Sequence, residues 1–181
     1  MKFILSIFCL SILLVSCQQP QDNSAKEKFA KNSETVKAYL EGFQNESADY
    51  SSFADNFVSL GTGFGSQDSI SLDQMKEWDK ESWKMFDFKL LNDPLVLLPG
   101  VNSDTKELDG SVRYYGAWQV TVPETDSTEA KSGVLRIYES YDFDENGKIL
   151  YQQGYGDFGG LMDYLMKPVP KAPAEDEAAA E

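Results

Sequence analysis

The spacing of apolar residues changes once along the chain, from helical to strand-like, close to Phe86. In residues 29–43 and 71–85, apolar side chains recur every three or four positions, which is typical of amphipathic helices. After Phe86 they alternate with polar residues or form short apolar runs, as they do in strands. Helices first and strands afterwards predict an α+β fold, in which N-terminal helices pack on one face of a curved, mostly antiparallel β-sheet.

The expected elements can be placed by residue number. Helices are predicted over 29–43, 50–57 and 71–85, with a closing helical turn over 161–166. Strands or apolar runs are predicted over 57–62, 86–90, 95–98, 112–122, 134–143 and 148–158. Ser71 is the expected N-cap of its helix. The apolar face of that helix is expected to carry Leu72, Met75, Trp78, Ser82 and Met85.

The N-terminus has the pattern of an exported, lipid-anchored protein. A positive start is followed by an apolar run over 3–15, which is too short to span a bilayer. The sequence LVSC at 14–17 resembles the bacterial lipobox, and the resemblance implies cleavage before Cys17 and lipid attachment to its sulfur. Residues 1–16 are then a signal peptide and 17–26 a flexible tether. The alternative is a signal cut elsewhere, with Cys17 incidental.

The lipobox resemblance also predicts the location of the protein. Acylated Cys17 would hold the mature chain on a membrane of the bacterial cell envelope. Gln18 stands where an Asp often retains lipoproteins at the inner membrane, so the outer membrane is favoured. Cys9 would leave with the signal, and no free thiol would remain for disulfides, catalysis or metal binding.

Composition limits the partners of the remaining chain. Residues 27–167 are expected to form one folded domain, and the Pro-, Ala- and acid-rich segment 168–181 a disordered tail. The 181 residues include 16 Lys+Arg, 30 Asp+Glu and no His, a net charge of −14. The acidic surplus argues against a nucleic-acid partner.

No metal or cofactor is expected. Residues 142–147 resemble the start of an EF-hand loop, but Gln153 occupies the position of the bidentate Glu of such a loop.

Two local patterns, together with the order of the elements, resemble a known fold family. They are the predicted hairpin over 134–149 and the ending Tyr155-Gly-Asp-Phe158. Most of residues 30–166 resemble the NTF2-like, SnoaL-like α+β cone. The resemblance implies a cone-shaped domain, but it does not select one function, because this fold hosts isomerases, dehydratases, hydrolases and transport adaptors.

The predicted hairpin also defines a candidate site. Asn146-Gly147 is typical of a two-residue type I′ turn, and the resulting register pairs Arg136 with Asp157 and Tyr138 with Tyr155. One interpretation is an ion pair that stabilises the sheet.

The other interpretation is a ligand pocket formed by Arg136, Tyr138, Tyr155, Asp157 and Trp118. Limonene-epoxide-hydrolase-like members of the resembled family use an Asp–Arg–Asp set in the cone. Arg136 and Asp157 match two of its members, but Tyr138 stands in place of the second acid, which makes hydrolysis doubtful. For Trp118, simple core packing is the alternative.

Glu139 is a second candidate residue. It falls in phase with the apolar side chains of its predicted strand, opposite Gly154. Because a glycine leaves room above a strand, Glu139 is a candidate for lining a cavity with a raised pKa. The alternative is an edge position in solvent.

Three functions remain open at this level. The first is a membrane-tethered module that binds a small apolar or amphipathic ligand, with no catalysis evident. The second is a SnoaL- or ketosteroid-isomerase-like enzyme in which Asp157 or Glu139 transfers a proton. The third is a scaffold that self-associates as a homodimer through an exposed sheet face. The absence of His, a thiol and a complete acid pair favours the first.

Overall fold

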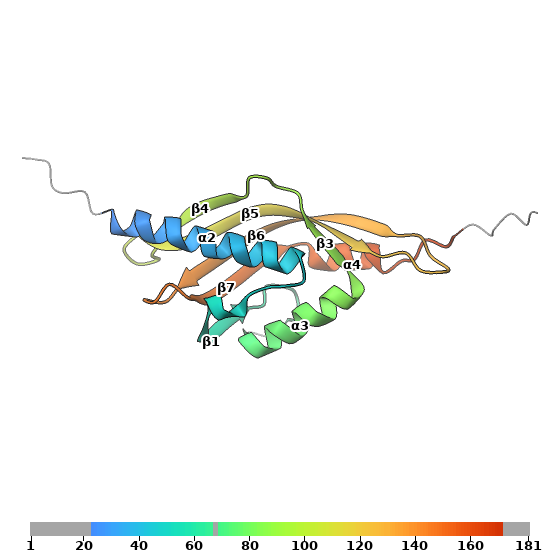
Figure 1. The fold of residues 1–181 in the computed structure, drawn as a ribbon, viewed down its shortest axis with the longest axis horizontal. Coiled ribbons are helices and arrows are strands. Elements are labelled where there is room, and N and C mark those ends of the chain that lie inside the picture. Colours follow the sequence, from blue (N-terminus) through green and yellow to red (C-terminus); the bar gives the residue numbers. More distant parts are fainter. Residues whose placement is uncertain (1–22, 67–68, 172–181) are drawn as a thin grey trace, which may run out of the picture.

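A computed structural model describes residues 23–66 and 69–171 (Figure 1). The predicted signal peptide, Cys17 and residues 172–181 of the predicted tail lie outside the described residues. The described elements are α2 (Ser24–Gln44), η1 (Tyr50–Ser52), β1 (Phe53–Leu60), β2 (Ile70–Ser71), α3 (Leu72–Met85), β3 (Asp87–Leu90), β4 (Val96–Val101), β5 (Leu108–Val122), β6 (Lys131–Phe143), β7 (Ile149–Gly156) and α4 (Phe158–Leu165). The first described helix therefore begins inside the predicted tether, at Ser24.

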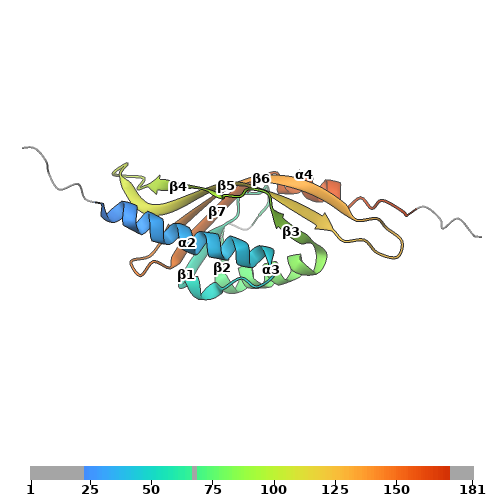
Figure 2. The same ribbon diagram turned by 45° about the horizontal axis from the view of Figure 1, so that its top comes forward.

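Seven strands form a single curved sheet in the order β2-β1-β7-β6-β5-β3, with β4 also paired to β5. All pairs are antiparallel except β1 with β7, which is parallel. Figure 2 shows α2 and α3 on the same side of this sheet, whereas α4 runs near the ends of β6 and β7. The expected α+β architecture, helices on a mostly antiparallel curved sheet, is confirmed.

The helix predicted over 50–57 is wrong. A single 3-10 turn ends at Ser52, and the chain continues as β1. The helix-like spacing of Phe53, Ala54 and Phe57 has another cause: the register between β1 and β7 shifts between Phe53 and Val58. An irregular strand interrupts the alternation of buried and exposed side chains. The buried residues of this strand are therefore spaced as they would be on one face of a helix.

Helix α3 begins as predicted, and its buried side agrees in part with the expected face. The Ser71 hydroxyl accepts a hydrogen bond from the Gln74 N–H, and the Gln74 side chain accepts one from the Ser71 N–H, which completes a capping box. Met75 is buried and Leu72 and Ser82 are partly buried, as expected. Trp78 and Met85 are exposed instead, and Asp79 is buried.

The β6–β7 turn differs from the predicted type I′ turn. The Gly147 N–H donates to the Asp144 carbonyl (3.1 Å), and Gly147 is the residue of the turn with positive φ (77°). This is a three-residue loop with a left-handed glycine. The register also shifts between Asp142 and Phe143. The shift compensates the longer loop, so Tyr138 pairs with Tyr155, as the sequence predicted.

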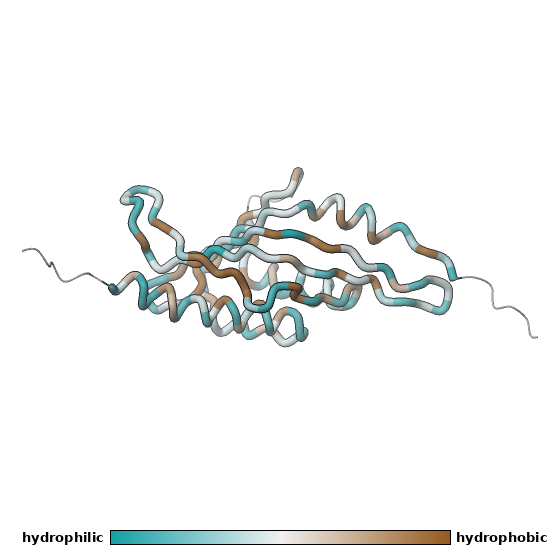
Figure 3. The backbone as a smooth tube through the Cα atoms, turned by 90° about the horizontal axis from the view of Figure 1, so that it is seen from above, coloured by the Kyte–Doolittle hydropathy of each residue, from teal (hydrophilic) through white to brown (hydrophobic). Residues whose placement is uncertain are grey.

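The two faces of the sheet differ in character. Side chains alternate between the faces along the long strands, and Figure 3 shows hydrophobic and hydrophilic residues interspersed along the chain. The concave face carries the core, including Val112, Tyr114 and Tyr141, on which Val36 and Leu40 of α2 pack. Among the described residues, no helix is long and apolar enough to cross a membrane.

Candidate functional site

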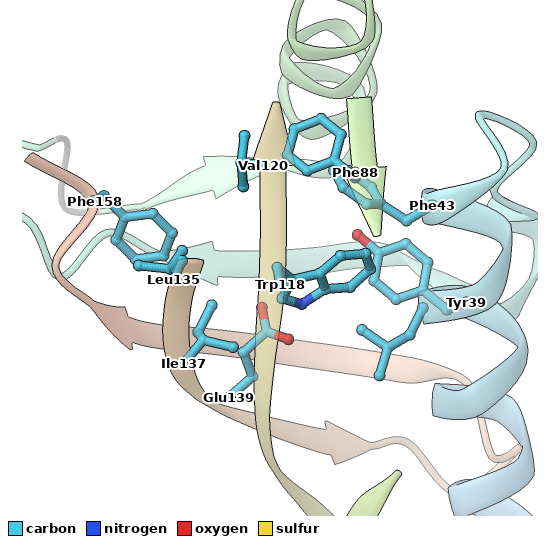
Figure 4. A pocket seen from close by; sticks show the side chains of 10 residues that line it. Tyr39, Phe43, Phe88, Trp118, Val120, Leu135, Ile137, Glu139 and Phe158 are labelled. Carbon is cyan, nitrogen blue, oxygen red and sulfur yellow. The ribbon is translucent and has the colours of Figure 1, made fainter. Parts of the chain in front are cut away.

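A cavity of about 150 Å³ lies between α2 and the concave face of the sheet. Its walls are aromatic and aliphatic apart from one carboxyl group, one hydroxyl group and the indole N–H of Trp118 (Figure 4). The lining side chains are Tyr39, Leu40 and Phe43 of α2, Phe88 of β3, Trp118 and Val120 of β5, Leu135, Ile137 and Glu139 of β6, and Phe158 of α4. A mainly apolar concave site with a few polar groups is the usual form of a small-molecule site.

Glu139 supplies the carboxyl group of this cavity. It pairs with Tyr114 on one side and with Gly154 on the other. The Tyr141 hydroxyl donates to Glu139 Oε2 (2.8 Å), and the Gln152 amide Nε2 donates to Oε1 (3.3 Å). Both carboxyl oxygens are therefore held in place, while the cavity side of the group stays open to a ligand.

The environment raises the pKa of Glu139 to about 7. Burial is the main cause, the hydrogen bonds from Tyr141 and Gln152 oppose it, and the nearby Asp79 carboxylate adds to it. Near neutral pH the group exchanges its proton readily, so it can act either as acceptor or as donor toward a bound molecule.

Tyr39 supplies the hydroxyl group. Its ring is held edge-on against Phe53 (5.0 Å between centroids) and against Tyr141 (6.4 Å). Its hydroxyl makes no hydrogen bond to any residue in the described part of the chain, and Figure 4 shows it turned into the cavity. Burial raises the pKa of Tyr39 well above its usual range, so the hydroxyl stays protonated and can donate.

A second buried carboxyl group lies on α3. Asp79 Oδ2 accepts a hydrogen bond from the Tyr50 hydroxyl (2.8 Å), and burial raises the pKa of Asp79 to about 6. Neither Asp79 nor Tyr39 was predicted as a site residue. Asp79 could have been found, because it lies four positions after Met75, in phase with the buried side of its helix. Tyr39 falls within the helical apolar spacing of residues 29–43, which gives no sign of a role for its hydroxyl.

The residues predicted to form one pocket lie on different faces of the sheet. Trp118 lines the cavity on the concave face. Tyr138 lies on the convex face, where its ring contacts Tyr115 (4.9 Å between centroids) and Tyr155 (6.1 Å). The alternation of side chains along β5 and β6 separates these groups, so Tyr138 and Tyr155 do not meet Trp118 in a common pocket.

The predicted ion pair between Arg136 and Asp157 does not form. Strand β7 ends at Gly156, and Asp157 becomes the N-cap of α4, where its Oδ1 accepts from the Gly160 N–H (2.9 Å). Both residues border a separate, open groove between β6 and α4. The ion pair on the convex face is instead Arg113 with Asp142 (2.9 Å).

The described residues contain no cluster of three or more His, Cys, Asp or Glu side chains that could hold a metal ion. Glu139 and Asp79 are buried acids from different elements, and they accept hydrogen bonds from tyrosine and glutamine side chains. The Glu139 carboxyl group can form a hydrogen bond to a bound molecule and exchange a proton with it.

No protein-family model and no curated protein sequence matches this chain. Solved structures do match. A phenazine biosynthesis-related protein from Pseudomonas aeruginosa is 19% identical and covers 91% of this chain and 98% of its own, with a TM-score of 0.56. A putative polyketide cyclase from Xanthomonas campestris is 14% identical, covers 76% and 98%, and has a TM-score of 0.58.

Two further structures widen the range of similar proteins. An NTF2-like protein from Anabaena variabilis is 13% identical, with coverage of 81% and 98% and a TM-score of 0.55. An LEH-like epoxide hydrolase from M. tuberculosis is 14% identical, with coverage of 75% and 90% and a TM-score of 0.53. At these identities the likeness concerns the fold.

Proposed function

The described domain has an NTF2-like α+β fold, and we propose that it binds a small, mainly apolar ligand in the cavity lined by Glu139. The observation that carries this proposal is one carboxyl group, held by two hydrogen bonds, in an otherwise apolar cavity. Similar folds include proteins described as polyketide cyclases and as an epoxide hydrolase, which supports a cavity used for small molecules.

The cost of burying Glu139 supports a functional role. Removing a carboxylate from water is unfavourable unless it is paired, and Glu139 has no cation partner among the ion pairs of the described residues. An apolar side chain of similar size would stabilise the core better. Perturbed acids in concave sites are typical of functional positions.

The binding site can be tested by filling it. Ile137 lines the cavity, so Ile137→Trp should occupy it. Thermal unfolding is measured with a panel of small neutral ring compounds, and the rise in Tm seen with the wild-type chain should vanish in this variant. Val134→Trp is the matched control, because Val134 lies on the same strand but is 52% exposed. Unchanged ligand stabilisation in Ile137→Trp would contradict the proposal.

Proton transfer is a second candidate function, favoured by the raised pKa of Glu139 and the free hydroxyl of Tyr39. The Glu139 carboxylate would take a proton from the carbon next to a ligand carbonyl. The electron pair of that C–H bond would move toward the carbonyl oxygen, and the Tyr39 hydroxyl would donate a hydrogen bond to the developing oxyanion.

This candidate predicts hydrogen exchange in a simple probe. Cyclohexanone in D₂O should exchange its α-hydrogens faster with the wild-type chain than with Glu139→Gln, by roughly 100-fold if Glu139 is the general base. Tyr39→Phe should slow exchange as well, whereas Tyr138→Phe, on the convex face, should not. Equal exchange rates with wild type and Glu139→Gln would leave ligand binding as the function.

The membrane location is also part of the proposal. The lipobox-like sequence ending at Cys17 supports a lipid anchor. Cells that express Cys17→Ala should release the chain from the membrane fraction and fail to label it with fatty acid. Cys9→Ala is the control, because Cys9 would leave with the signal peptide and its loss should change neither result.

A further inference from the structure

We infer that the cavity takes a neutral molecule of one aromatic ring that carries a hydroxyl group, a phenol in the simplest case. The inference rests on the proposed binding function and adds the chemical class of the ligand. Three features of the cavity support it: its size, the arrangement of its aromatic walls, and the polar groups of Glu139 and Tyr39 that reach it.

The size of the cavity corresponds to one ring. A buried apolar cavity of roughly 150 Å³ is large enough to bind benzene, and the cavity here is about 150 Å³. A rigid two-ring compound exceeds this volume, so it would not fit wholly inside the cavity.

The walls suit an aromatic ring. Phe43 contacts Phe88 edge-on (4.9 Å between centroids) and Trp118 edge-on (5.6 Å), and Phe88 is also edge-on to Trp118 (6.4 Å). These side chains present both ring faces and ring edges near one space (Figure 4). Aromatic rings prefer edge-to-face and offset contacts, so a further ring can extend this arrangement.

The charge of the lining disfavours anions. No lysine or arginine is among the cavity residues, whereas Glu139 is. A bound carboxylate would place a second negative group beside Glu139 without a counter-charge, which is strongly unfavourable in a buried site. The ligand is therefore not an acid.

Glu139 and Tyr39 together indicate a hydroxyl. Each Glu139 oxygen accepts one hydrogen bond already and has a further lone pair for a ligand donor, whereas the Tyr39 hydroxyl has no partner among the described residues. A hydroxyl group donates one hydrogen bond and accepts others, so it satisfies both. An ammonium group has donors only and would leave Tyr39 unpaired, and a methyl group would satisfy neither.

The test is a set of dissociation constants for the full chain at pH 8, measured by NMR titration with phenol, toluene, benzoate, benzylamine and 2-naphthol. Phenol should bind at least tenfold more tightly than toluene, which has the same ring without the hydroxyl. Benzoate should not bind. Glu139→Gln and Tyr39→Phe should each reduce the ratio of phenol to toluene affinity, while Tyr138→Phe should leave it unchanged.

The same measurements distinguish a wrong ligand class from a wrong binding site. Toluene or benzylamine binding as tightly as phenol would overturn the hydroxyl assignment, and tighter binding of 2-naphthol would overturn the one-ring assignment. In both cases loss of binding in Ile137→Trp would still support the cavity as the binding site. No binding of any probe to the wild-type chain would overturn both the inference and the proposed function.

Discussion

The side chain of Glu139 lies beside the space that Gly154, its partner across the β6–β7 ladder, leaves empty by having no Cβ. A Cβ atom at position 154 would lie 3.6 Å from Glu139 Oε1 and 3.6 Å from Cγ. These are ordinary contact distances, so alanine fits at this position, but a larger side chain would occupy the space next to the carboxyl group.

This relationship predicts a graded effect of substitution at Gly154. Gly154→Ala should bind cavity ligands as the wild type does, because its one added carbon meets Glu139 without overlap. Gly154→Val should displace the Glu139 side chain and weaken phenol binding at least tenfold. Equal affinities for the two variants, measured by NMR titration, would mean that Gly154 does not control the position of Glu139.

Stability should fall as pH rises through the range in which the two buried acids ionise. The pKa of Asp79 is raised from 3.8 to about 6, and that of Glu139 from 4.5 to about 7. In both cases the folded state holds its proton more tightly than the unfolded state. The resulting stabilisation is complete below about pH 4 and is lost by about pH 7.

The size of this effect follows from the shifts. Each corresponds to about 3 kcal/mol in the free energy of unfolding. The free energy of unfolding is measured with denaturant at pH 5 and at pH 8. Its decrease between pH 5 and pH 8 should be smaller in Glu139→Gln than in the wild type. An identical loss in both proteins would show that Glu139 titrates normally.

The Tyr50–Asp79 hydrogen bond should stabilise the packing of α3. Tyr50→Phe leaves the buried Asp79 carboxylate without the donor that satisfies it (2.8 Å). We expect a loss of about 1–3 kcal/mol in the free energy of unfolding at pH 8. A double-mutant cycle with Asp79→Asn measures the coupling between the two side chains, and a coupling energy of zero would contradict the prediction.

Self-association through the convex face stays a prediction. Tyr115 and Tyr155 are each about half exposed there, beside Tyr138, and tyrosine-rich faces are typical of interfaces. Tyr155→Glu should shift sedimentation toward a monomer. Tyr164→Glu is the matched control, because Tyr164 is equally exposed (50%) but lies on α4. A wild-type chain that stays monomeric at every concentration would exclude this interface.

Much of the β6–β7 region could be predicted from its sequence. The alternation of polar and apolar residues placed Glu139 on the concave side, and the Asn-Gly pair located the turn to within a residue. The exact turn type was wrong, yet the pairing of Tyr138 with Tyr155 was correct, because the register shift near Asp142 offsets the longer loop.

Contacts between side chains from segments far apart in the chain could not be predicted from sequence periodicity. Whether Asp157 faces Arg136 depends on where β7 ends, and the chain turns into α4 one residue too early for that pair to form. Asp79 and Tyr39 belong to different helices, and only the packing of α3 and α2 sets their positions relative to Glu139.

The sequence by itself thus determined the class of fold, the capped start of α3 and the strand face that Glu139 occupies. These depend on side-chain periodicity and on hydrogen bonds between near neighbours, which a short segment encodes. The tertiary structure alone decided that Tyr39, Trp118 and Glu139 share one cavity while Tyr138 and Tyr155 lie outside it. That outcome depends on how α2 packs across the curved sheet, which no single segment specifies.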